Sequence, residues 1–175
     1  VQNTFTLAFG PDWTGSLTES KIQSTDVYAS DYFGSSVSMS NDGAYAIVGA
    51  YGEDDGGSSA GAAYVFKRTG SNWAQQAKLI ASDAQASDYL GYTEGVSISA
   101  DGSYAAAGAI LEATGGTFAG AGYIFVRSGT SWSQQAKVVA SNPSDYDRFG
   151  YGVSLSGDGS YAIFGAYGED TTASG

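Results

Sequence analysis

Histidine and cysteine are both absent from the 175-residue sequence. Without histidine there is no imidazole general base, no Ser–His or Cys–His nucleophile pair and no imidazole metal ligand. Without cysteine there is no disulfide framework and no thiolate metal site. A Ser–Lys pair or paired carboxylates stay formally open. However, the acidic residues recur with a sequence repeat, whereas a catalytic site usually brings unlike residues together once. We therefore expect no enzymatic activity.

Basic residues are scarce as well. Seven Lys and Arg stand against 18 Asp and Glu, for a net charge of −11 and a pI near 4.1. So few cations cannot build a phosphate-binding patch, which argues against a nucleic-acid partner. No apolar run approaches the roughly 18 residues that a membrane-spanning helix needs, so we expect no membrane insertion. The 26 Gly and 13 Tyr instead suit short strands and tight turns.

One phrase, Val-Ser-x-Ser-x-Asp-Gly-x-Tyr-Ala, occurs three times. The copies begin at Val37, Val96 and Val153, which are 59 and then 57 residues apart. Between the first two units the register continues without a gap, because Tyr64 and Trp73 recur 59 residues later. The chain is therefore a tandem array of one unit.

Each unit is expected to form four antiparallel strands, near residues 37–40, 45–50, 63–68 and 73–80 of the first copy. Apolar residues alternate with serine in the first strand, and an Asp-Gly pair follows as a hairpin turn. Four short strands at this period predict an all-β fold of β-propeller blades, about three blade equivalents and incomplete on its own. The expected divisions are a half blade at 1–30, blades at 31–87 and 88–146, and a half blade at 147–175.

Phe33-Gly34 followed by Val48-Gly49-Ala50-Tyr51 resembles the FG-GAP repeat, and the third unit repeats the pattern from Phe149 to Tyr167. That repeat is the blade of the integrin α-subunit propeller and of many bacterial and algal surface proteins. The resemblance implies a location outside the cell or at its surface. Tyr51 and Tyr167 stand where the family prefers proline, and the middle unit has Ile110-Leu111 for the Tyr-Gly pair, so its loop should be reshaped.

The acidic surface could attract cations, with weak calcium binding as the specific possibility, and no cofactor is required. The family's calcium ligands lie in the loop between the first two strands of a blade, which is too short here to wrap an ion. The next loop could supply a weak Ca²⁺ site, or could be a solvated acidic loop. The middle copy, with a single carboxylate at Glu112, should not bind. The residues concerned are Glu53, Asp54 and Asp55 in the first unit and Glu169 and Asp170 in the third.

Four aromatic residues are candidates for contact with a ligand or partner. Tyr51 and Tyr167 follow a glycine-alanine pair on a loop, where a ring can be exposed. Trp73 and Trp132 could stack on a sugar, or could pack at the start of a recurring strand. Asp31 and its equivalents should instead accept backbone hydrogen bonds in a turn.

These observations favour a non-catalytic structural or protein-interaction module of an extracellular assembly. The alternative is a carbohydrate-binding propeller lectin, with a glycan as the ligand. Because the chain begins with half a blade and ends with half a blade, we expect a protein partner or further copies of the chain to complete the propeller or to form a filament.

Overall fold

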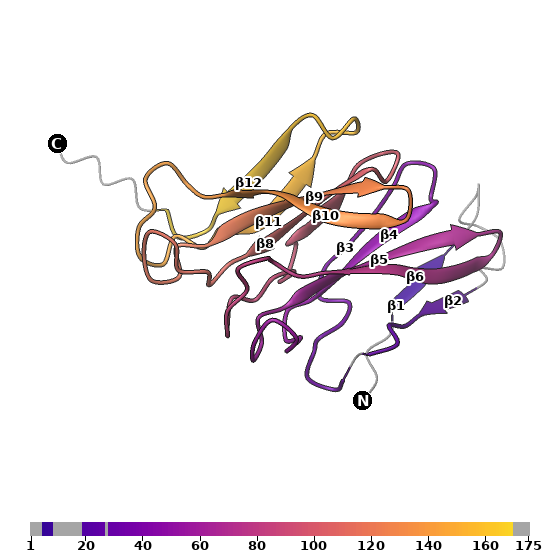
Figure 1. Ribbon diagram of the computed structural model, residues 1–175, viewed down its shortest axis with the longest axis horizontal. Helices are drawn as coiled ribbons and strands as arrows, with labels where there is room; N and C mark the ends of the chain where they lie inside the picture. The colour runs from indigo at the N-terminus through magenta and orange to yellow at the C-terminus, as the bar shows by residue number, and fades with distance from the viewer. Residues whose placement is uncertain (1–4, 9–18, 27, 170–175) are drawn as a thin grey trace.

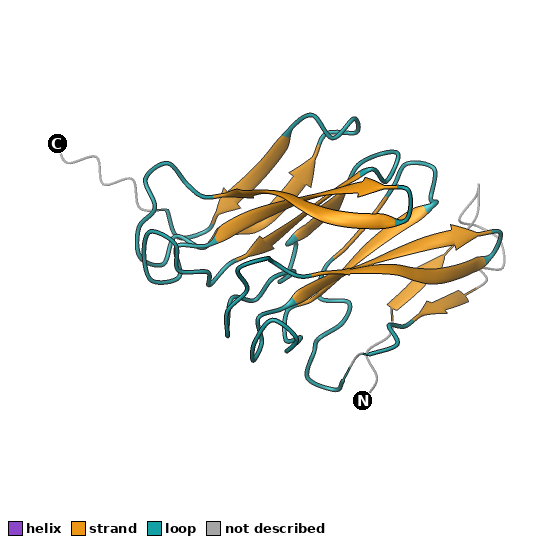
Figure 2. Cartoon of the chain, in the orientation of Figure 1, coloured by secondary structure: helices purple, strands orange, loops and turns teal. Residues whose placement is uncertain are grey.

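The computed structural model describes residues 5–8, 19–26 and 28–169. Twelve β-strands make up the described part of the chain, and no helix occurs in it (Figure 2). The strands are β1 Phe5–Ala8, β2 Glu19–Ile22, β3 Val37–Met39, β4 Tyr45–Ala50, β5 Ala62–Thr69, β6 Asn72–Leu79, β7 Val96–Ile98, β8 Tyr104–Ala109, β9 Ala121–Ser128, β10 Ser131–Val138, β11 Phe149–Leu155 and β12 Ala162–Ala166.

The strands form two complete blades and two half blades. Antiparallel sheets of four strands are built by β3 to β6 and by β7 to β10, each in the order of the sequence. The strand pair β1–β2 lies beside the first complete blade and β11–β12 beside the second, at opposite ends of the array (Figure 1). The expected all-β, propeller-type and incomplete architecture is confirmed.

The hairpin between the first two strands of each blade closes on an aspartate. Asp42 Oδ1 accepts hydrogen bonds from Ser40 Oγ at 2.7 Å and from the Ala44 N–H at 2.9 Å. Gly43 follows with a φ of +64°, a conformation that a residue without Cβ adopts at little cost. Asp101 and Asp158 repeat the arrangement. The turn is therefore local chemistry that each unit carries with it.

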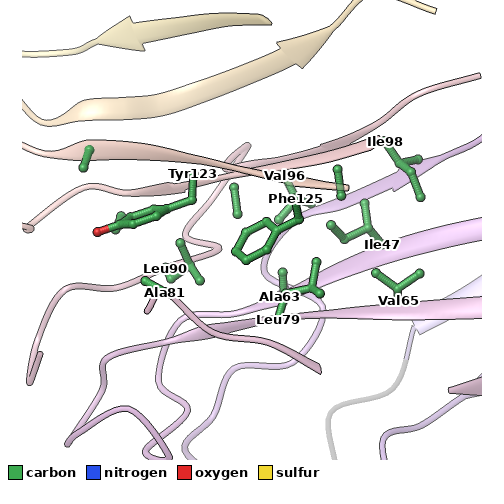
Figure 3. Close-up of a cluster of buried hydrophobic side chains, with 14 of the residues drawn as sticks. Ile47, Ala63, Val65, Leu79, Ala81, Leu90, Val96, Ile98, Tyr123 and Phe125 are labelled. Atoms are coloured by element: carbon green, nitrogen blue, oxygen red, sulfur yellow. The ribbon is translucent and has the colours of Figure 1, made fainter. Parts of the chain in front are cut away.

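The main core lies between the two complete blades (Figure 3). Side chains alternate along β4 and β9, so that Ile47 from the first blade and Tyr123 and Phe125 from the second meet in one cluster. All three are at most 2% exposed. A second cluster joins the first blade to the N-terminal half blade through Ile22 and Tyr64. The main cluster therefore draws on both complete blades, and the first blade carries a second buried cluster on its other face.

The Phe-Gly or Leu-Gly step of each unit attaches that unit to the blade before it. Leu90 N–H donates to Ala60 O at 2.9 Å, and Leu90 forms a parallel bridge with Gly61. Gly91 then lies against Gly49, where an added Cβ would overlap the Gly91 carbonyl oxygen. Gly108 and Gly150 repeat this contact at the next junction. Glycine is required on both sides because two backbones touch there.

The third unit differs from the expected strand limits. Its first strand, β11, begins at Phe149 rather than near Val153, because Phe149 pairs with Ala166 and an irregularity separates that pair from the one at Val153. In the second blade the corresponding residue, Leu90, pairs with Ala109 through an isolated bridge that is not part of β7.

Candidate functional site

Six tyrosines from three successive units make one continuous series of ring contacts. They come from the segments around each Phe-Gly or Leu-Gly step and from the turns after β4 and β12. The six, called the tyrosine row below, are Tyr32, Tyr51, Tyr89, Tyr92, Tyr151 and Tyr167. Because the series runs from one unit to the next, it spans both junctions between units.

Tyr51 is the centre of the row at the first junction. Its ring stacks on Tyr32 with centroids 4.6 Å apart, and its other contacts are Tyr89 at 5.4 Å and Tyr92 at 4.9 Å. Burial among these rings, followed by the charges that the neighbouring tyrosines would carry, raises the pKa of Tyr51 above its usual range. The first junction is therefore filled by neutral, mutually packed rings.

At the second junction the row continues, but its rings leave a cavity open. The ring centroids of Tyr92 and Tyr151 are 6.1 Å apart. Tyr151 stacks on Tyr167, with ring centroids 5.0 Å apart. Tyr167 is 69% exposed, so its ring is offered to solvent. A cavity of about 270 Å³ opens here, lined by four tyrosines of the row together with Ile110, Leu111 and Arg148.

The acidic loops converge on lysines rather than on one another. Lys78 Nζ lies 2.5 Å from Glu53 Oε1 and 3.1 Å from Asp26 Oδ2, and it also bonds to Asp55. Burial by itself would lower the pKa of Lys78, but the hydrogen bonds to Asp55, Glu53 and Asp26 outweigh it and raise that pKa. The ammonium ion thus holds the loop between β4 and β5 onto β6 and supplies the cation that the carboxylates face.

The second blade repeats this centre with one change. Lys137 Nζ lies 3.0 Å from Glu112 and 2.7 Å from Asp83, and it bonds Thr114 Oγ1 at 2.8 Å in place of a third carboxylate. In the third unit Asn142 occupies the position of Asp83 and donates directly to Glu169 at 2.9 Å. These lysine centres were missed in the sequence, although the 59-residue spacing of Lys78 and Lys137 is the signal that marks them.

The described calcium candidates accordingly have partners within the protein. Glu53 and Asp55 contact Lys78, whereas Asp54 Oδ1 accepts a hydrogen bond from the Ser59 N–H at 2.7 Å. Within the described ranges, no three acidic side chains gather in a way that could hold a metal ion. Asp170 lies outside the described residues. A weak calcium site at Glu53 to Asp55 stays a prediction.

The two candidate tryptophans are half-buried and pack against the core clusters. Trp132 packs on the main cluster and donates from Nε1 to Gln76 Oε1 of the preceding blade at 2.9 Å. Trp73 packs on the second cluster, and its Nε1 is buried with no acceptor in the described part of the chain. Their positions favour the packing interpretation over sugar stacking.

The aspartates before each Phe-Gly or Leu-Gly step act within turns, as expected. Asp31 and Asp88 each accept a hydrogen bond at 2.7 Å from the backbone N–H three residues earlier, and Asp147 does so at 2.6 Å. Each backbone carbonyl of the three accepts from the loop after the second strand of the same unit. These residues therefore position the loops that carry Tyr51 and Tyr167.

The repeated Phe-Gly and Gly-Ala contacts agree with the comparison to known families. The model of the FG-GAP repeat matches residues 17–66, 73–125 and 132–175, more than half of the chain. The chain belongs to the FG-GAP repeat family. No curated protein matched the sequence. Among the described residues, no helical segment could cross a membrane.

The limits of the FG-GAP repeat differ from the limits of the β-sheets. The first matched range, 17–66, contains β2 of the half blade together with β3, β4 and most of β5 of the next sheet. One repeat therefore covers the junction between two sheets, including the Phe-Gly contact that joins them. In this FG-GAP protein the tyrosine row lies along those same junctions, so the repeat that fixes the fold also spaces the row.

Proposed function

We propose that this FG-GAP protein is a non-catalytic interaction module of an extracellular or cell-surface assembly, and that the tyrosine row is its contact surface for a protein partner. The observation that carries the proposal is the continuity of ring contacts from Tyr32 to Tyr167 across three units. The location outside the cell rests on the family alone.

Tyrosine is well suited to such a surface. Its ring buries a large area while only two side-chain torsions are fixed, and its hydroxyl can meet polar groups at the rim. Tyrosine and arginine are enriched among the residues that dominate binding energy. Tyr32, at 50% exposed, and Tyr167, at 69%, supply accessible faces at the two ends of the row.

The absence of histidine supports a binding role over a catalytic one. The buried carboxylates also have structural partners. Asp88 and Asp147 accept backbone hydrogen bonds, and Glu53 and Glu112 bond to lysines. A general acid or base would need a carboxylate that is free to exchange a proton with a substrate.

The test is affinity capture of surface-labelled extracellular proteins from the source, followed by a binding measurement with the purified partner. The double variant Tyr32→Ser/Tyr167→Ser should weaken binding by tenfold or more. Tyr161→Ser is the matched control, because Tyr161 is 77% exposed and lies at the opposite end of β12 from Tyr167. Equal binding by both variants would contradict the proposal.

A carbohydrate-binding lectin is the second candidate, because the exposed face of Tyr167 could stack on a sugar. A glycan array separates the two functions. Glycan binding that is lost in Tyr32→Ser/Tyr167→Ser and kept in Tyr161→Ser would favour the lectin. An array without signal, together with row-dependent protein binding, would favour the interaction module.

A further inference from the structure

The two junctions differ at one residue of the repeat. Tyr51 packs against the rings of both Tyr89 and Tyr92 at the first junction. The residue at the same position of the second unit, directly after Gly108-Ala109, is Ile110. Isoleucine is smaller than tyrosine and cannot reach as far. The space that a tyrosine fills at the first junction is part of the 270 Å³ cavity at the second.

A second departure places a cation in that cavity. Tyr32 and Tyr89 precede their Phe-Gly or Leu-Gly steps, and the third unit has Arg148 there instead. The Arg148 guanidinium lies over the Tyr167 ring with its carbon 5.9 Å from the centroid. Its Nε is buried and donates to no acceptor in the part of the chain that the structure describes.

The other two arginines each make an Nε hydrogen bond of the kind that Arg148 lacks within the described structure. Arg68 Nε donates to Gly43 O at 2.6 Å, and Arg127 Nε donates to Gly102 O at 2.7 Å. Among the described residues, the side chain of Arg148 has no equivalent bond, and none of those that line the cavity is acidic. A planar guanidinium with free donors, in a site without an anion, matches a carboxylate better than any neutral group.

We propose that this cavity binds the carboxylate of a glutamate or aspartate side chain presented by the protein partner, an inference that rests on the proposed function. Arg148 would pair with the carboxylate, Ile110 and Leu111 would contact the aliphatic stem, and Tyr92 and Tyr151 would flank it. The volume is at the low end for small-molecule sites, which suits one side chain.

A sugar acid fits the lining less well. Its hydroxyl groups call for carboxylate or amide side chains as paired acceptors and donors, and the lining residues that the structure describes include no Asp, Glu, Asn or Gln. The overall charge of −11 also opposes a long acidic segment, so specificity comes from the single ion pair at Arg148.

The experiment is an NMR titration of the full chain with N-acetyl-glutamate N-methylamide. We expect saturable shifts with a dissociation constant on the order of millimolar, as suits a ligand of this size. The glutamine analogue and glucuronate should each bind at least about tenfold more weakly, because charge-assisted hydrogen bonds contribute most of the affinity. Stronger binding of glucuronate than of the glutamate probe would overturn the proposal.

Two variants test the site independently. Arg148→Gln removes the cation, and Ile110→Tyr restores the residue of the first unit and fills the cavity; each should weaken binding of the probe about tenfold or more. Lys67→Gln removes one positive charge from an exposed side chain on β5, away from the cavity, and should leave binding unchanged. Thermal melts confirm that each variant is folded.

Failure of this inference is distinguishable from failure of the proposed function. If the glutamate probe binds equally to the wild type and to folded Arg148→Gln and Ile110→Tyr, the cavity is not a carboxylate site. If the partner is nevertheless lost in Tyr32→Ser/Tyr167→Ser, the tyrosine row remains the contact surface and only the inference about the cavity is overturned.

Discussion

In the described part of the chain, the second complete blade has a sheet on each of its faces, whereas the C-terminal half blade has one on a single face. Burial follows this difference and not the sequence. Ile47 of the first blade faces the second blade and is fully buried, but Ile163, at the same position of the third unit, is 70% exposed. Tyr45 is 7% exposed and its equivalent Tyr161 is 77% exposed.

The first strands show the same effect on the other face. Val96 of the second blade is 5% exposed, and its equivalent Val37 is 57% exposed. The pattern of a strand therefore determines which face a side chain occupies, and only a neighbouring sheet turns that face into core. Residues at equivalent positions of the repeat can therefore differ several-fold in their contribution to the free energy of unfolding.

Truncating the two isoleucines should give the largest contrast. Ile47→Ala leaves a cavity in the main core and should lower the free energy of unfolding by about 2–5 kcal/mol. Ile163→Ala removes a mostly exposed side chain and should change it by no more than about 0.5 kcal/mol. Urea unfolding of both variants measures the difference. Equal losses would show that the outer face of β12 is covered in solution.

Adding one methyl group at the backbone contact should give the next largest effect. In Gly108→Ala the new Cβ would overlap the Gly150 carbonyl, which should destabilise the chain by about 1–3 kcal/mol. Gly165→Ala is the matched control, because the nearest atoms, Gly152 N and O, are 3.7 and 3.8 Å from the added Cβ. A loss of stability in Gly165→Ala similar to that in Gly108→Ala would contradict this interpretation of the junction.

Acid should remove the stabilisation of the Asp-Gly turn equally in the second blade, at Asp101, and in the C-terminal half blade, at Asp158. Hydrogen bonds from Ser103 and Ser99 lower the pKa of Asp101 to about 2, and those from Ser156 and Ser160 lower that of Asp158 to about 2. Because these pKa values lie below the unfolded value, the stabilisation is present above about pH 4 and is lost as the pH falls towards 2. Asp88 acts in the opposite direction, since burial raises its pKa.

The corresponding variants test whether the turn depends on its neighbours. Asp101→Asn and Asp158→Asn should each lower stability at neutral pH and make the loss of stability in acid shallower, by similar amounts. Thermal melts between pH 2 and pH 7 measure both. A flatter acid limb in Asp101→Asn alone would mean that the neighbouring sheet, and not the local turn, sets the pKa.

Calcium removal should have the smallest effect. Lys78 already contacts Glu53 and Asp55, so an added cation must compete with a positive charge in place. We expect a chelator to leave the melting temperature nearly unchanged. A large stabilisation by calcium that is abolished by substituting Glu53, Asp54 and Asp55 would show a metal site in that loop. If it survived the substitutions, the site would be elsewhere.

Much of the fold could be predicted from the sequence because its causes are local. The Asp-Gly turn at Asp42 closes through atoms within two residues, and the alternation of Val37 to Met39 gives a strand wherever it occurs. The 59-residue spacing fixes the number of strands per blade. The predicted limits of β3 to β6 consequently agree with the structure to within about one residue.

The candidate site was predicted only in part. Tyr51 and Tyr167 stood out because each follows a glycine-alanine pair on a loop, and both lie in the tyrosine row. The other four members, Tyr32, Tyr89, Tyr92 and Tyr151, were missed, since nothing in their sequence spacing says that rings from different units meet. The acidic loop was considered for calcium because its lysine partner lies on another strand.

The sequence by itself determined the repeat, the strands, the turns and the absence of histidine and cysteine chemistry. The tertiary structure alone decided which copies of each motif are buried and which charges meet. It also placed Ile110 and Arg148 beside one cavity. The physical reason is distance along the chain. Hairpin hydrogen bonds join residues two to five apart, whereas Lys78 meets Glu53 across 25 residues and Asp26 across 52, a proximity that exists only once the sheets have packed.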